Sequence, residues 1–122
     1  MKDSKVTNKI RKLAINEMKR DVFYGAKTII IAYGNPNESN LYVQDASCAL
    51  ENMFLAANAL KLGSCWINQV DELLNSKKGK LLKAQLGLKE EDVVVGSCAL
   101  GYIAKDFKER EITVKEERAR TL

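Results

Sequence analysis

DASCALENMFLAANALKLGSCWINQV, residues 45–70, is the stretch that decides the fold of this 122-residue chain. It predicts a long helix with almost no polar face, followed by a short buried strand that delivers Asn68 and Gln69 to a loop. A helix that is apolar nearly all round lies in a core or between subunits rather than on a surface. Gly63 is the residue we expect to adopt the left-handed conformation that commonly ends a helix.

Outside this stretch, the apolar spacing predicts two further strands and the helices that separate them. An amphipathic helix is expected over residues 4–20, a buried strand over 28–33, an interrupted helical segment over 71–86 and a third buried strand over 93–103. Strands separated by helices predict an α+β fold, built as an α/β layered sandwich in one domain over residues 1–122. The strands are too far apart in sequence for hairpins, so some should pair through crossover connections.

The composition excludes several classes of function. The net charge is only +4, and basic residues alternate with acidic ones, so a nucleic-acid partner is not expected. No apolar run reaches the roughly 18 residues that a membrane helix requires, so no membrane association is expected either. The chain has no histidine, which excludes histidine triads and histidine-ligated metals. We therefore expect no catalytic side chain and no metal, and chemistry that belongs to a cofactor.

Cysteine usage and the N-terminus indicate the compartment. The N-terminal residues lack the apolar core of a secretory signal. The chain has three cysteines, Cys48, Cys65 and Cys98, and all of them stand in apolar runs. An odd number of thiols in such surroundings predicts reduced, buried cysteines in a cytoplasmic protein.

Several segments of this sequence resemble, in the same order, the nitroreductase family of FMN-dependent oxidoreductases. The resemblance rests on Asp45-Ala46, Glu51-Asn52-Met53 and Leu55-Ala56-Ala57 in the long helix, on Leu62–Ile67 after it, on Phe23–Ala26 with the apolar run Thr28–Ala32, and on Val93–Tyr102. It covers residues 20–110. It implies an FMN-dependent enzyme that takes hydride from NADH or NADPH and reduces nitroaromatic or quinone-like acceptors. It also implies an intertwined homodimer with flavins at the subunit interface.

The resemblance assigns cofactor contacts to five residues. Ile67, Asn68 and Gln69 would meet the isoalloxazine ring, with a backbone N–H of Asn68 toward the N5 side. Lys108 and Arg110 correspond to a Lys-x-Arg pair that binds the FMN phosphate. From the residues alone, Asn68-Gln69 could equally be a polar turn, and Lys108 and Arg110 could be part of a solvated tail.

One family feature has no counterpart in these residues. Nitroreductases normally begin with an Arg-x-Ser-x-Arg segment that grips the FMN ribityl chain and phosphate, so we expect a nitroreductase-like fold that is incomplete at the N-terminus. Three explanations stay open: a fragment of a longer reading frame, a naturally short member that binds flavin weakly, or a truncated, flavin-free scaffold or interaction protein without catalytic activity. Losing several charge-assisted contacts of about 1.5–3 kcal/mol each would weaken FMN binding by several powers of ten.

Overall fold

The computed structural model describes residues 4–113 of the chain. Seven elements follow one another: α1 (Ser4–Met18), β1 (Thr28–Gly34), α2 (Tyr42–Ala59), β2 (Leu62–Ile67), α3 (Gln69–Asn75), α4 (Lys80–Gln85) and β3 (Val93–Tyr102). Each lies within a few residues of the range expected from the sequence. The prediction of one domain over residues 1–122 also takes in residues 1–3 and 114–122, which lie outside the described part.

The three strands form one antiparallel sheet in the order β1-β3-β2, so the last strand occupies its centre. Along β3, Ile30 of β1 faces Cys98, while Ile67 of β2 faces Ser97. β1 pairs with β3 and not with β2, the next strand in the chain, which confirms the expected crossover for that pair, whereas β2 and β3 are consecutive strands. Because β2 ends opposite Ser97, the first residues of β3 extend beyond it.

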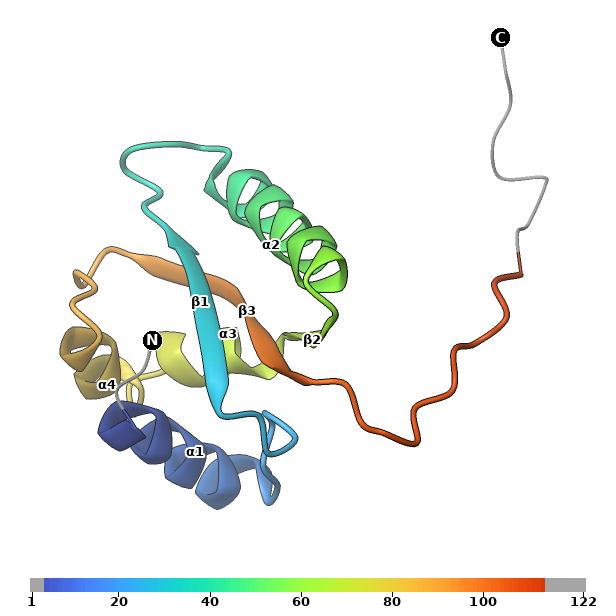
Figure 1. Cartoon of the computed structure of the whole chain (residues 1–122). Helices are drawn as coiled ribbons and strands as arrows, with labels where there is room; N and C mark the ends of the chain where they lie inside the picture. The colour runs from blue at the N-terminus through green and yellow to red at the C-terminus, as the bar shows by residue number, and fades with distance from the viewer. Residues whose placement is uncertain (1–3, 114–122) are drawn as a thin grey trace, which may run out of the picture.

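The helices cover both faces of the sheet, which makes the predicted layered sandwich. α2 lies on one face, and α1, α3 and α4 lie on the other (Figure 1). The larger core joins side chains of these three helices to one face of the sheet, including Ile10, Leu74 and Val94. The smaller core joins Leu50 of α2 to Cys98 of β3 on the opposite face. Alternation along each strand therefore divides the apolar residues between two cores.

The expectation of three buried strands is wrong for β2. Ser64 and Cys65 are exposed in the middle of β2, where they line a hollow between β2, β3 and the turn before β1. Cys48, on α2, is exposed as well, so only Cys98 of the three thiols is buried as predicted. An apolar run marks a segment that can be buried, but the elements that pack around a strand decide whether it is.

The helix end was also assigned to the wrong residue. α2 ends at Ala59, and Lys61 takes the left-handed conformation with a φ of 58°. Gly63 instead lies in β2, opposite Gly101. The ladder with β3 begins at Leu62, so the chain must turn before Gly63 is reached, and Lys61 adopts a backbone conformation that favours glycine.

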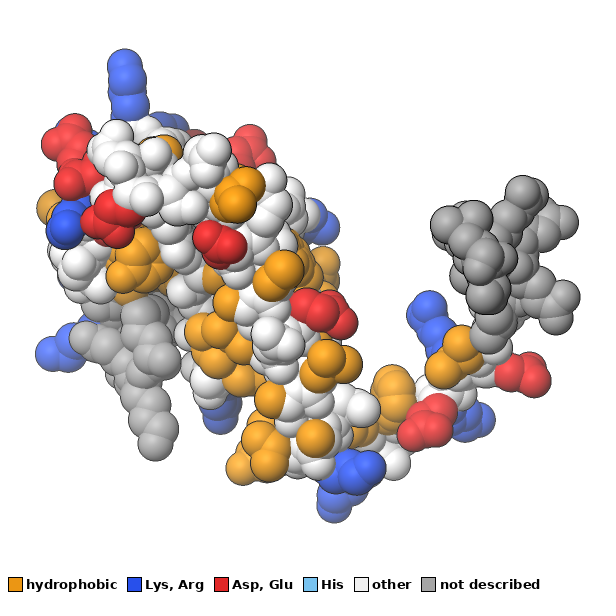
Figure 2. All heavy atoms as spheres, turned by 90° about the horizontal axis from the view of Figure 1, so that it is seen from above, with side chains coloured by type: hydrophobic (Ala, Val, Ile, Leu, Met, Phe, Trp, Pro, Cys, Tyr) orange, Lys and Arg blue, Asp and Glu red, His pale blue; other side chains and the backbone are white. Residues whose placement is uncertain are grey.

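α2 presents a broad apolar surface away from the sheet. Only Ala46, Leu50 and Ala57 of this helix are buried. Leu55 is 61% exposed, and Leu60, directly after the helix, is 71% exposed. Figure 2 shows hydrophobic side chains gathered over this side of the molecule. Within residues 4–113, no helix combines the length and the apolar character that crossing a membrane requires.

Candidate cofactor site

Ile67, Asn68 and Gln69 lie at the junction where β2 passes directly into α3. Ile67 is 1% exposed and closes β2, Asn68 is exposed, and Gln69 begins the helix. The predicted loop is thus a single residue. Asp71 lies inside the first turn of α3, where its carboxylate accepts the N–H of Glu72 at 2.6 Å.

The junction can offer hydrogen-bond donors from a rigid backbone. Asn68 occupies the N-cap position with φ −77° and ψ −38°, and its side chain makes no capping bond. In the first turn of α3, the N–H of Asp71 donates to the Asn68 carbonyl and that of Glu72 to the Asp71 carboxylate, so the donors that a ligand could use are those nearest Asn68. Since Ile67 and Val70 are both buried, the backbone between them is held at either end. Such a junction suits a ligand with a planar edge of hydrogen-bond acceptors.

Trp66 packs on the face of the sheet that α2 covers, whereas Ile67 and Val70 of the junction pack into the larger core on the other face. Its indole belongs to the core under α2, with its ring centroid 6.2 Å from that of Phe54. A Cβ atom added to Gly96 would stand 3.0 Å from the indole ring, so glycine is required for this close approach. Trp66 is therefore a packing residue beside the junction.

Lys108 and Arg110 are exposed residues of an extended arm that follows β3. The arm leaves the sheet after Tyr102 and points away from the helices (Figure 1). Tyr102 faces Leu62, the first residue of β2, whereas the junction begins at Ile67, the last. Five residues of strand separate these positions, about 17 Å. A single chain therefore places the predicted ring contacts and phosphate contacts at opposite ends of β2.

A hollow of about 200 Å³ near the start of the arm was not anticipated from the sequence. Its walls come from the turn before β1 and from β2 and β3, and they include Phe23, Tyr24, Cys65 and Tyr102. In the sequence, the segment Phe23–Ala26 stands out only through its resemblance to the family. No periodicity or motif marks a turn as the wall of a cavity, because the opposing wall comes from distant strands.

The turn beside this hollow is held by the Asp21 carboxylate. Its two oxygens accept the N–H groups of Phe23 and Gly25, each at 3.0 Å. Arg11 approaches the same carboxylate at 3.1 Å and donates to the carbonyl of Ala26. Burial by itself would raise the pKa of Asp21, but the N–H groups of Phe23 and Gly25 and the Arg11 charge together lower it below its usual 3.8.

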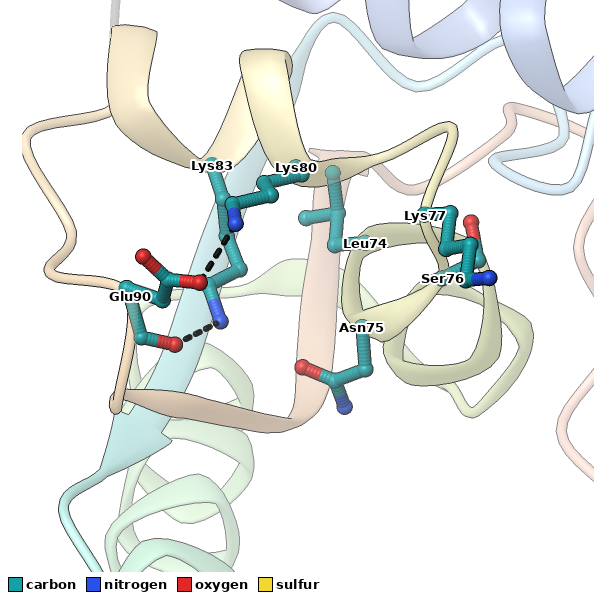
Figure 3. Close-up of a pocket in the computed structure, with 7 residues that line it drawn as sticks. All are labelled: Leu74, Asn75, Ser76, Lys77, Lys80, Lys83 and Glu90. Carbon is teal, nitrogen blue, oxygen red and sulfur yellow. Dashed lines mark hydrogen bonds and ion pairs between the residues drawn. The ribbon is translucent and has the colours of Figure 1, made fainter.

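A second hollow, between α3, α4 and the turn before β3, is rich in lysine (Figure 3). Lys83 is buried and donates to the main-chain carbonyls of Glu90 and Asp92, while Lys80 pairs with the Glu90 carboxylate. Figure 3 shows Lys77 turned away from this pair of lysines. These cations bind the turn to α4, so the hollow is not an open anion site.

Comparison with known proteins shows which sequences and structures this chain is similar to. The sequence model of the Nitroreductase family matches residues 2–102. A relative from Archaeoglobus fulgidus, named as a candidate NADH dehydrogenase/NAD(P)H nitroreductase, is 33% identical over an alignment 99 positions long that covers 76% of this chain. The match spans 55% of that relative, so the chain accounts for about half of its length.

Solved structures of nitroreductases share the fold of this chain. A nitroreductase with bound FMN from Bacteroides fragilis is similar with a TM-score of 0.78 and 30% identity, over 97% of this chain and 68% of that one. A nitroreductase with bound FMN from Desulfitobacterium hafniense reaches a TM-score of 0.79 at 16% identity, over 100% of this chain and 72% of that one. The second likeness, at this identity, shows the shared fold alone.

Proposed function

Because the chain belongs to the nitroreductase family, we propose that it acts as an FMN-dependent NAD(P)H oxidoreductase that reduces nitroaromatic or quinone-like acceptors. FMN, when bound, would supply the ring that accepts hydride from NADH or NADPH and passes electrons on. The protein's own residues would bind and orient that ring. No side chain of the chain needs to act as an acid or a base.

The single observation that carries this proposal is the geometry of the β2–α3 junction. Asn68 is exposed between two buried residues, Ile67 and Val70, at a helix start whose N–H groups its side chain does not cap. A donor that faces a reacting ring must be held in place before the ligand arrives. This geometry supports the assignment of Ile67, Asn68 and Gln69 to the edge of the flavin ring, which the family resemblance implies.

The residues that we propose to contact the FMN phosphate lie in a different segment, the arm that follows β3. Lys108 and Arg110 stand one residue apart in an extended arm, so both can converge on one dianion. They lie beyond Tyr102, far from Asn68 along the sheet. We place the flavin at the subunit interface of a homodimer, where an arm can complete a site that the folded body begins. The exposed apolar surface of α2 supports such an assembly.

The cytoplasm is the compartment we propose. Cys48 and Cys65 are exposed and unpaired in the described part of the chain. Exposed free thiols persist where glutathione and thioredoxin keep them reduced.

The test is a visible absorption spectrum of the purified protein, before and after incubation with FMN and gel filtration. The wild-type chain should retain a flavin band that NADH or NADPH bleaches. Replacing both Lys108 and Arg110 by Ala should weaken FMN binding by about 100-fold or more, since two charge-assisted contacts are lost. Thermal unfolding should not change, because both side chains are exposed.

The matched control removes the same charge elsewhere. Lys12 is an exposed residue of α1, and Arg20 is an exposed residue just after it. Replacing both by Ala should leave FMN binding unchanged. Equal losses in both double variants would indicate general electrostatics rather than a phosphate site. A colourless wild-type protein that ignores added FMN would favour the flavin-free scaffold instead.

A further inference from the structure

α3 is a short helix whose position depends on its contacts with the sheet. It has seven residues, and so short a helix is not stable by itself in water. Its buried side chains, Val70, Leu73 and Leu74, pack into the larger core. Apolar packing of this kind resists separation from the sheet more strongly than sliding along it. Directional contacts at the two ends are needed to fix the helix along its axis.

The end contact farther from the junction is made by the Asn75 side chain. Its amide donates to the carbonyl of Val94 at 2.8 Å and accepts the N–H of Val94 at 3.0 Å. The carboxamide thus makes the pair of bonds that a neighbouring strand residue would make. Figure 3 shows the Asn75 side chain leaving the end of α3 below the lysine-rich hollow.

Val94 can accept this contact because β2 has already ended. Ile67 faces Ser97, and β3 runs on from there to Val93 without β2 beside it. Val94 faces Tyr33 of β1 on its other side. The chain therefore leaves the β3 edge at Asn68, runs through α3, and returns to the same edge through the Asn75 amide.

α3 and the stretch of β3 between Ser97 and Val94 have about the same length. A helix of seven residues is about 10 Å long. Ser97 and Val94 are three strand residues apart, which is also about 10 Å. At the junction end, the buried hydroxyl of Ser97 donates to the carbonyl of Ile67 at 3.5 Å. α3 is thus attached at both ends along a single stretch of β3.

We propose that Asn75 is a positioning residue for the cofactor site. Its two bonds to Val94 fix α3 along the sheet and thereby set the direction of the backbone N–H groups in the β2–α3 junction, where Asn68 lies. The inference rests on the proposed function only for what the junction binds. Asn75 itself lies at the far end of α3, about 10 Å from the junction. A misplacement of a supporting element by about 1 Å is enough to weaken a site that depends on orientation.

The experiment compares Asn75→Ala with Asn35→Ala. Asn35 also donates one side-chain bond, to Asp92 at 3.2 Å, and accepts one, from the N–H of Asn37 at 2.9 Å. It lies in the turn after β1, so its loss should lower stability without moving α3. The first measurement is amide hydrogen exchange in the flavin-free protein. Asn75→Ala should speed exchange at Leu73 and Leu74, whereas Asn35→Ala should not.

The second measurement is FMN affinity together with the reduction potential and absorption maximum of the bound flavin. Asn75→Ala should weaken FMN binding by about tenfold and shift both the potential and the absorption maximum, because the donors are re-aimed. Asn35→Ala should leave all three at wild-type values, even where the two variants have equal melting temperatures.

The outcomes separate the two proposals. Wild-type exchange and wild-type flavin properties in Asn75→Ala would overturn the positioning role, and so would equal changes in Asn35→Ala. A wild-type chain that binds no FMN would overturn the proposed function and the flavin part of this inference. The exchange measurement would then still decide whether Asn75 holds α3.

Discussion

Asp21 illustrates how one side chain can shape a wall of the molecule. The turn that it holds contains two consecutive residues with positive φ, Tyr24 at 53° and Gly25 at 77°. A left-handed conformation is unfavourable for tyrosine, so other contacts must hold the backbone there. The bonds from Phe23 and Gly25 to the Asp21 carboxylate serve this purpose, and Arg11 ties the same turn to α1.

A pH dependence follows from the lowered pKa of Asp21. Because its folded pKa lies below the unfolded value near 3.8, the ionised carboxylate stabilises the fold above that pH. This contribution is lost as the pH falls through the folded pKa. Asp21→Asn should therefore lower the free energy of unfolding by about 1 kcal/mol at pH 7, through weaker hydrogen bonds.

Urea unfolding of both proteins from pH 7 to pH 2 measures the effect. The difference between wild type and Asp21→Asn should shrink below about pH 4, because the wild-type carboxyl becomes protonated there. A constant difference over the whole range would show that the carboxylate charge contributes nothing to the turn.

At the scale of elements, the corner between α3 and α4 leaves no room for a side chain at Gly79. Gly79 is buried where the chain turns from the end of α3 into α4. A Cβ atom at this position would lie 2.2 Å from the carbonyl oxygen of Leu73 and 2.6 Å from the Cα atom of Leu74. Both are backbone atoms, so relief would require moving α3 itself.

Gly79→Ala should therefore lower the free energy of unfolding by about 1–3 kcal/mol, the usual cost of overpacking. Gly101→Ala is the matched control, because a Cβ atom there meets nothing within 4 Å. Thermal unfolding of the two variants gives the comparison. Equal melting temperatures would mean that the corner can open without cost, and α3 would then be less firmly placed than its contacts indicate.

At the scale of the whole molecule, the apolar outer surface of α2 and the extended arm remain uncovered in a single chain. The arm carries Phe107 and Ile112, both exposed, in addition to its charged residues. Exposed apolar surface of this extent is typical of protein–protein interfaces. Together with the distance between the two groups of predicted cofactor contacts, it favours assembly of two copies.

Leu55→Glu tests this assembly. A charge placed at the centre of an apolar interface should convert the wild-type dimer into a monomer, measured by sedimentation velocity at micromolar concentration. Leu81→Glu is the control, because Leu81 of α4 is 69% exposed on the other side of the sheet. Circular dichroism should stay unchanged in both. A monomeric wild-type chain, or dimer loss in the control as well, would contradict an interface on α2.

What the sequence by itself determined was the set of elements and the identity of the junction residues. Helix and strand ranges follow local periodicity, so α1, β1, α2 and β3 begin and end close to the expected residues. Ile67, Asn68 and Gln69 were assigned to the cofactor through a family resemblance; the family is confirmed by the match over residues 2–102, and the cofactor contacts stay a prediction.

Tertiary structure alone decided how these parts face one another. The packing around β2 left Cys65 exposed beside a hollow, and the start of the β2 ladder moved the left-handed turn from Gly63 to Lys61. The strand order set Asn68 and the arm at opposite ends of β2 and brought the Asn75 amide to Val94. The physical reason is common to all of these: local patterns encode which residues can be buried or turned, whereas exposure and proximity depend on partners far away in the chain.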